Sequence, residues 1–198
     1  MERLVFATWV FLKDCSTNGT DVEFVCAVGV VNNDLAMGED LFLVSANKVY
    51  FVDPVGTGTH LMVTAPGNIR DIRYNPTDKN LYYLTSSGQP AVFGFNPTEK
   101  PVNVFSIRTS GAPEHLAVNV DENELIYNIG TNLYRYDIDE KKEELITASF
   151  PSVSALVAYK NKIYDVRDGM VETRRLDGSI ITSFPAPAAT RLEVFGEC

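Results

Sequence analysis

The chain has 198 residues, 45% of them hydrophobic and 22% charged, which is typical of one folded domain and excludes a largely disordered or collagen-like protein. Its 17 Lys and Arg against 26 Asp and Glu give a net charge of −9. Because this sign repels phosphate groups and anionic lipids, no nucleic acid is expected as a partner. The longest apolar runs fall short of the ~20 residues that span a bilayer, so we expect no transmembrane segment in this chain.

Residues 1–34 form an N-terminal segment with two open interpretations. Residues 4–12 have the length of a signal-peptide apolar region, although Glu2 weakens the basic flank. Alternatively, residues 5–13 and 22–31 are rich in Val and Phe and pair as a β-hairpin. Asn18 is a glycosylation candidate and Cys15 and Cys26 are a disulfide candidate, both conditional on an oxidising compartment. The three cysteines fit no zinc spacing.

From residue 41 onward, the sequence consists of short β-rich runs separated by Gly, Pro, Asn and Asp, which predicts an all-β chain. Four segments share the order strand, polar turn, strand: residues 49–63, 92–106, 133–147 and 171–184. Asp53, Asn96, Asp137 and Arg175 take the same place in them, at intervals of 43, 41 and 38 residues. Such a period is typical of the blades of a β-propeller.

The other half of each repeat has the same pattern at residues 69–84, 114–129 and 153–166, and residues 41–45 supply the matching second strand of the first unit. Four strands in ~40 residues make one propeller blade, whose first strand lines the central channel. We therefore predict four-stranded propeller blades over residues 35–198, about four in number. Their inner strands are expected to start near Phe24, Ile69, His115, Ser154 and Arg191. An unrelated β-sandwich would also give short strands, but it does not predict paired half-repeats in constant register.

The second strands NLYYLT (80–85), ELIYNIG (124–130) and NKIYDVRDG (161–169) resemble the YWTD repeat, or class B repeat, of low-density lipoprotein receptor propellers. Residues 111–127, 171–179 and 40–54 resemble the flanking segments of that repeat. The resemblance implies a six-bladed ring, of which about four blades are present, and a family role in binding protein ligands on the face that holds the central opening.

This sequence departs from the family pattern at two positions of each repeat. The Trp position holds Tyr83, Tyr127 and Tyr164, and the Asp position holds Thr85, Ile129 and Val166. Because the family Asp joins neighbouring blades, the resemblance implies a weakened polar network between blades here.

Few residues are candidates for catalysis. The chain has two histidines, His60 and His115, and neither lies in a catalytic signature. The glycines of residues 54–60 fit a hairpin turn better than a phosphate loop, and the acidic residues 121–124 and 139–144 fit solvated turns better than metal ligands. We therefore predict no catalytic residue, no metal and no cofactor.

Binding residues are expected on one face of the propeller. The turns between second and third strands share a face with the connections between blades, and we call this the connection face. Loops on a rigid scaffold commonly carry recognition. The candidate ligand-binding residues on it are Asn68, Arg70, Ser87, Gln89, Glu114, His115, Ser152, Arg167 and Asp168.

The first hypothesis is a non-enzymatic protein-binding module of an extracellular protein or membrane-receptor ectodomain, with a basic protein ligand favoured by the negative charge. The receptor resemblance implies neighbouring EGF-like modules or a membrane anchor in a longer product. One alternative is a hydrolase resembling the calcium-dependent lactonase propellers, with Asn68, Asp71 and Glu114 near the channel. Another is an intracellular interaction propeller of NHL type.

Overall fold

A computed structural model describes residues 34–37, 41–52, 59–186 and 192. The first blade consists of β1 (Asp34–Met37), β2 (Leu41–Ser45), β3 (Lys48–Val52) and β4 (Thr59–Thr64). The second consists of β5 (Ile69–Asn75), β6 (Asn80–Thr85), β7 (Ala91–Phe95) and β8 (Val104–Arg108). The third consists of β9 (His115–Asn119), β10 (Glu124–Ile129), β11 (Asn132–Asp137) and β12 (Lys142–Thr147). The fourth consists of β13 (Ala155–Tyr159), β14 (Lys162–Arg167), β15 (Met170–Arg175) and β16 (Ile180–Pro185).

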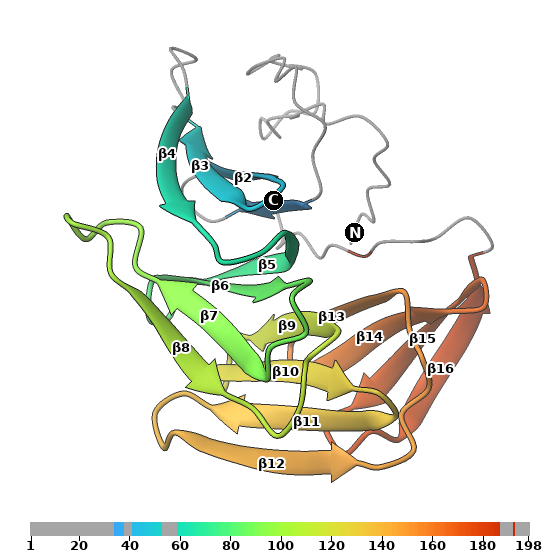
Figure 1. The fold of residues 1–198 in the computed structure, drawn as a ribbon. Helices are drawn as coiled ribbons and strands as arrows, with labels where there is room; N and C mark the ends of the chain where they lie inside the picture. The colour runs from blue at the N-terminus through green and yellow to red at the C-terminus, as the bar shows by residue number, and fades with distance from the viewer. Residues whose placement is uncertain (1–33, 38–40, 53–58, 187–191, 193–198) are drawn as a thin grey trace, which may run out of the picture.

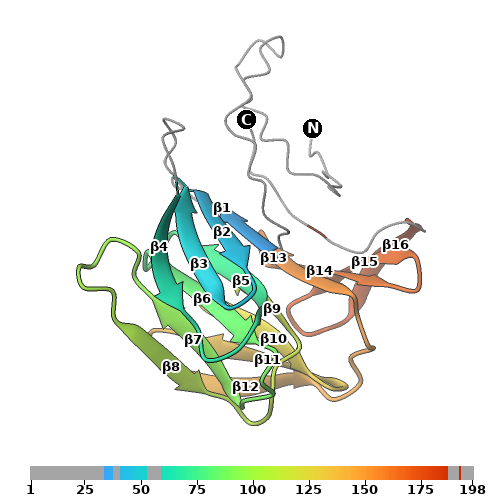
Figure 2. The same cartoon turned by 45° about the horizontal axis from the view of Figure 1, so that its top comes forward.

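Each blade is an antiparallel sheet in which strands that are consecutive in the chain are hydrogen-bonded neighbours. The first strands of the blades, β1, β5, β9 and β13, contact one another in that order at the centre of the molecule. The fourth strands, β4, β8, β12 and β16, lie at the periphery (Figures 1 and 2). This arrangement is a β-propeller, which confirms the predicted fold class.

The inner strands at Ile69 and His115 begin where the sequence predicts them, and β13 begins one residue after Ser154. The prediction of a first inner strand near Phe24 is wrong, because β1 occupies that place and pairs with β2 from Asp34↔Val44 to Met37↔Leu41. The predicted signal peptide or hairpin, Cys15, Cys26, Asn18 and the predicted strand at Arg191 lie outside the described residues. The division of the chain into an N-terminal segment at 1–34 and blades at 35–198 stays a prediction.

Apolar side chains between neighbouring blades form the core. Phe42, Val44 and Val49 of the first blade pack on Leu81 and Tyr83 of the second. Alternate residues of the same strand point the other way, so that Tyr82 and Leu84 pack against the third blade. Because both faces of β6 are covered, Leu81–Thr85 is buried without a break. A third cluster fills the space between the third and fourth blades.

The polar contacts between blades come from other positions than the family motif. Asn75, the last residue of β5, donates from Nδ2 to Oδ1 of Asn123, 2.8 Å away in the next blade. Asn119, the last residue of β9, donates in the same way to Asn161 at 3.2 Å. Both acceptors are turn residues with positive φ, 52° and 56°, which Asn tolerates better than most residues. The contact therefore repeats with the blades.

The outer strands are not equivalent. Register shifts interrupt the pairing of β4, β12 and β16 with their neighbours. In contrast, β8 pairs with β7 without a shift, from Ala91↔Arg108 to Phe95↔Val104. Bulges bend an edge strand and hinder its pairing with another chain. Among the four described outer strands, β8 alone lacks this protection.

Candidate functional site

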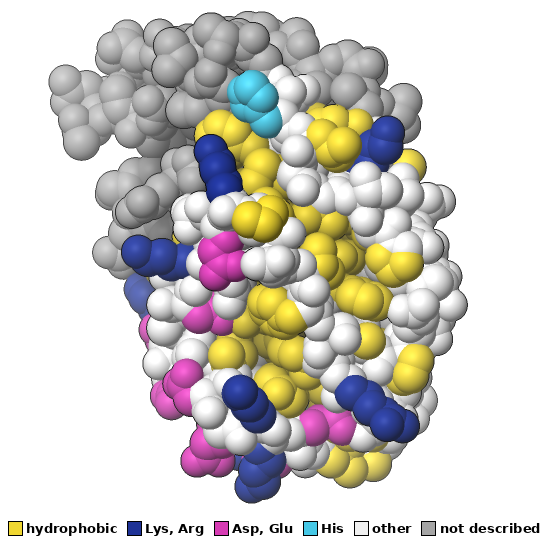
Figure 3. Space-filling model, turned by 60° about the vertical axis from the view of Figure 1, so that its left-hand side comes forward, with side chains coloured by type: hydrophobic (Ala, Val, Ile, Leu, Met, Phe, Trp, Pro, Cys, Tyr) yellow, Lys and Arg dark blue, Asp and Glu magenta, His cyan; other side chains and the backbone are white. Residues whose placement is uncertain are grey.

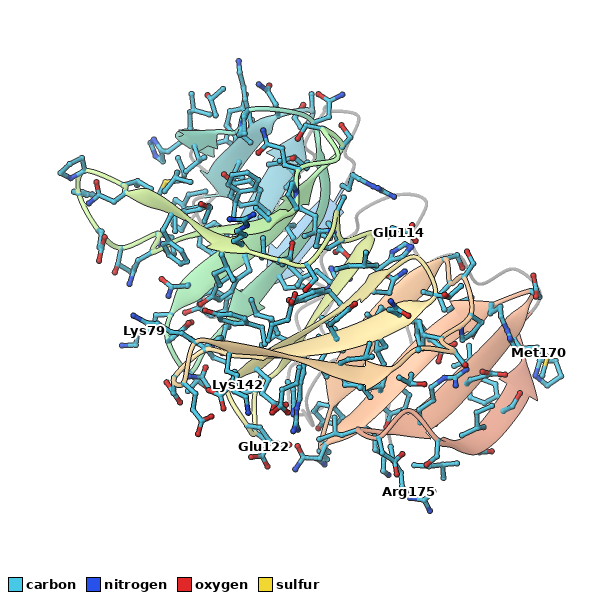
Figure 4. All side chains as sticks on the ribbon, turned by 60° about the horizontal axis from the view of Figure 1, so that its bottom comes forward. Lys79, Glu114, Glu122, Lys142, Met170 and Arg175 are labelled. Atoms are coloured by element: carbon cyan, nitrogen blue, oxygen red, sulfur yellow. The ribbon has the colours of Figure 1, made fainter. Side chains whose placement is uncertain are left out.

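Backbone hydrogen bonds tie the turns and connections of the connection face together. The Ala46 carbonyl between β2 and β3 accepts from the Ile69 N–H at 2.8 Å, and the Asn68 carbonyl accepts from the Ser86 N–H at 2.7 Å. Figure 4 shows the two ends of the blades, with Glu114 and Met170 toward one end and Lys79, Glu122 and Arg175 toward the other. The structure therefore gives the candidate loops a rigid frame.

Three of the predicted residues come together beside the channel, where β5 and β9 begin. Arg70 is exposed on β5, and it forms no hydrogen bond or ion pair with any described residue. Glu114 and His115 lie at the start of β9 and are half-buried. We call Arg70, Glu114 and His115 the central cluster. It presents a guanidinium group, a carboxylate and an imidazole at one place on the connection face.

A residue that the sequence did not indicate positions this cluster. Asn128 is fully buried on β10, and its Nδ2 donates to Glu114 Oε2 at 3.0 Å. Its Oδ1 accepts from the His115 N–H at 3.1 Å, and its carbonyl accepts from the Glu114 N–H at 3.0 Å. Asn128 thus fixes both residues. This positioning role could not be predicted from the sequence, because a single Asn near the end of a strand is not part of a recognisable motif.

The electrostatics of the cluster keep His115 neutral. Burial lowers the pKa of His115, and the positive charge of Arg70 lowers it further. Glu114 and a hydrogen bond with the Val153 backbone oppose this shift without reversing it. The imidazole is therefore an uncharged hydrogen-bonding group near neutral pH, and Arg70 supplies the positive charge.

The other predicted residues are placed on the same face but outside the central cluster. Arg167 donates from Nη2 to Glu172 Oε1 at 2.9 Å, so it is engaged within its own blade. Ser87 shares a 2.6 Å hydrogen bond with Thr85. Asn68, Gln89, Ser152 and Asp168 are exposed in turns or connections. The structure therefore separates the nine candidates into a central group and a peripheral group.

The calcium-site alternative finds no support in this geometry. Asp71 accepts from the Leu116 N–H at 2.9 Å and forms an ion pair with Arg73 at 2.8 Å. Its carboxylate therefore joins two inner strands. Within residues 34–37, 41–52, 59–186 and 192, no three His, Cys, Asp or Glu side chains are placed to share a metal ion. In the same residues, no helix is long and apolar enough to cross a membrane.

Four antiparallel blades around a common centre define the chain as a β-propeller protein. Its structure is similar to a chain in the crystal structure of a nidogen/laminin complex, with a TM-score of 0.71 and 15% identity over 88% of this chain and 72% of that one. It is also similar to an auxiliary nutrient binding protein from Bacteroides ovatus, with a TM-score of 0.65 and 14% identity over 88% of this chain and 48% of that one. At these identities, the likeness shows the fold alone. No family model matches the sequence, and no curated protein matches it.

Proposed function

We propose that this chain is a non-enzymatic, protein-binding propeller of the YWTD receptor type, and that its ligand contacts the central cluster. The observation that carries the proposal is the exposed guanidinium of Arg70, unpaired among the described residues, next to a fixed carboxylate and imidazole. Arg is among the residues that most often anchor protein interfaces. A ligand carboxylate at Arg70 and a ligand donor at Glu114 would satisfy both charges.

The chemistry of the cluster favours binding over catalysis. Among the described residues, no hydroxyl, thiol or carboxylate group forms a hydrogen bond with the His115 side chain, so no activated nucleophile is formed there. The other histidine, His60, is exposed on β4 and stacks on Phe51 with ring centroids 6.4 Å apart. The two proteins of similar fold are a member of a nidogen/laminin complex and an auxiliary nutrient binding protein. These observations support a binding role.

An extracellular or receptor-ectodomain setting, a basic ligand and neighbouring EGF-like modules belong to the same proposal, and the YWTD resemblance is their support. The charge distribution refines the expectation of a basic ligand. The described residues hold 14 Lys and Arg and 17 Asp and Glu, which is a net charge of −3 out of −9 for the whole chain. Long-range attraction of a basic ligand would therefore come mainly from the remaining residues, and the central cluster would supply local pairing.

The test is a binding screen of the full chain against secreted and ectodomain proteins, followed by matched variants on the partner that is found. Arg70→Ala and Glu114→Gln are expected to weaken binding ~10-fold or more, as removal of an interface anchor does. Arg175→Ala and Glu122→Gln make the same chemical changes at the opposite end of the blades and are expected to bind like the original chain (Figure 4). Unchanged binding by both connection-face variants would refute this site.

A further inference from the structure

The outer strand of the second blade is an open edge. Val104, Phe105, Ser106 and Arg108 are exposed, and the strand has no charged residue before Arg108. Its pairing with β7 has no bulge. Edges of this kind pair readily with another strand, because their outer N–H and C=O groups lack partners within the sheet. The β8 edge is therefore a candidate interaction surface.

The hydrogen-bond pattern identifies which backbone groups of β8 are available. The Thr109 N–H donates to the Pro90 carbonyl at 2.9 Å, so Thr109 points toward the neighbouring strand. Backbone groups alternate along an antiparallel strand, so Ile107 and Phe105 also point toward β7. Those of Val104, Ser106 and Arg108 point away from the sheet. Three consecutive outward positions thus offer both a donor and an acceptor.

The side chains on this edge have fixed positions. The Phe105 ring lies over Gly94, where an added Cβ would come within 2.5 Å of the ring. It also meets the Tyr82 ring edge-on at a centroid distance of 6.0 Å. Phe105 nevertheless remains 40% exposed and Val104 48% exposed. A partner strand would therefore meet preorganised apolar side chains.

We propose that β8 pairs antiparallel with β8 of a second copy of this chain, about a two-fold axis at Ser106. In this register Ser106 lies opposite Ser106, and Phe105 lies opposite Ile107 of the second copy, twice by symmetry. Aromatic side chains opposite β-branched ones stabilise a sheet. The outward groups of Val104 meet those of Arg108, and the central Ser106 groups meet each other. The pairing satisfies all the outward groups of these three residues.

The charge on the strand is compatible with self-pairing in this register. The two Arg108 side chains lie at opposite ends of the paired strands, so no like charges face each other across the axis. Figure 3 shows further hydrophobic side chains gathered along this side of the molecule. Exposed Leu61 and Leu145 lie on the outer strands of the adjacent blades. Because a stable dimer buries ~800 Å² per partner, five residues alone would give a weak dimer.

The experiment is sedimentation velocity of the full chain from about 5 to 500 μM, with Ser106→Lys and Ser106→Glu as variants. The original chain is expected to show a reversible monomer–dimer equilibrium. Each variant places two like charges opposite each other at the axis, and its dimer dissociation constant should rise ~10-fold or more. An equimolar mixture of the two variants should dimerise again, because Lys then faces Glu.

Ser183→Lys is the matched control, since Ser183 is an exposed Ser on the bulged outer strand β16. It should dimerise like the original chain, and thermal melts should show that all variants are folded. A chain that stays monomeric at every concentration overturns the proposal. So does an equal loss of dimer in the control, or a mixture that stays monomeric. Capture of a different protein's strand, with no self-association, would also refute the second copy as the occupant.

Discussion

Arg174 on β15, near the interface between the third and fourth blades, is a buried residue that we expect to be sensitive to substitution. Its positive charge is paired with two buried carboxylates. It donates from Nε to Asp165 Oδ2 at 2.6 Å and from Nη2 to Glu172. Its guanidinium also lies over the Phe150 ring of the preceding loop, 5.2 Å from the centroid. Burial raises the pKa of Asp165 despite this hydrogen bond. Asp165 therefore depends on Arg174 for its opposite charge, whereas Glu172 is also paired with Arg167.

Arg174→Met is expected to lower the free energy of unfolding at pH 7 by about 3–5 kcal/mol, the usual cost of leaving a buried charge unpaired. The neighbouring exposed Arg175→Met should change it by less than about 0.5 kcal/mol. Urea unfolding measures both. Because a raised carboxyl pKa gives stability that is present at low pH and lost as pH rises, the deficit of Arg174→Met should shrink toward pH 4.5. A pH-independent deficit would contradict this explanation.

His115 makes the opposite contribution to pH dependence. Burial and Arg70 lower its pKa in the folded state, so the unfolded chain takes up the proton first as pH falls below about 6.5. Stability from this group is therefore present at neutral pH and lost on acidification. His115→Asn should lose less stability between pH 7.5 and 5.5 than the original chain does. His60→Asn, at an exposed position on β4, is the comparison, and an equal response of the two variants would refute the assignment.

Strands illustrate what sequence patterns predict and what they leave out. The half-repeats place β5 and β9 at the right residues, because each strand is bounded by polar turns and paired with a second strand of the same repeat. The first inner strand is predicted to start near Phe24, yet residues 34–37, with the sequence DLAM, form the first strand of blade 1. Pairing with β2 and contact with β5 decide this strand, and intrinsic β-propensity does not.

The same limit applies to the candidate site. The repeat register placed Arg70, Glu114 and His115 on one face, because it fixed which strand ends meet there. The repeat register did not indicate Asn128, because the positioning role of this buried residue depends on the three groups with which it forms hydrogen bonds. Nor did it show that Arg167 is engaged with Glu172, because that contact joins two strands across a turn. Position follows from repeats, whereas hydrogen-bond partners follow from packing.

At the contact between two blades, the Asn75–Asn123 pair is expected to act as a local unit. Asn75→Ala and Asn123→Ala should each destabilise the chain, and a double-mutant cycle should give a coupling free energy of about 1 kcal/mol. Asn161 lies at the next contact along the ring, so Asn75→Ala and Asn161→Ala should be additive. Urea unfolding of the single and double variants gives these values. A coupling free energy between Asn75 and Asn161 as large as that between Asn75 and Asn123 would show that the contacts are not local.

For the whole molecule, the arrangement of the described carboxylates predicts a response to divalent cations. Asp71 and Glu114 are already engaged by Arg73 and Asn128, so these two described carboxylates form no prepared calcium site beside the channel. The melting temperature of the full chain should be the same with millimolar calcium and with a chelator. Differential scanning calorimetry measures it. A clear rise with calcium would favour a metal-dependent propeller instead.

The asparagine contact between blades also indicates which blade could be duplicated to give a longer propeller. The donor stands at the end of an inner strand and the acceptor immediately before a second strand. Blade 2 has the donor Asn75 but Lys79 at the acceptor position, and blade 4 has the acceptor Asn161 but ends its inner strand at Tyr159. Blade 3 carries both, Asn119 and Asn123. A tandem duplicate of blade 3 would therefore find the Asn donor or Asn acceptor that it needs in the blade on each side. This makes blade 3 the suitable unit for building longer propellers from this chain.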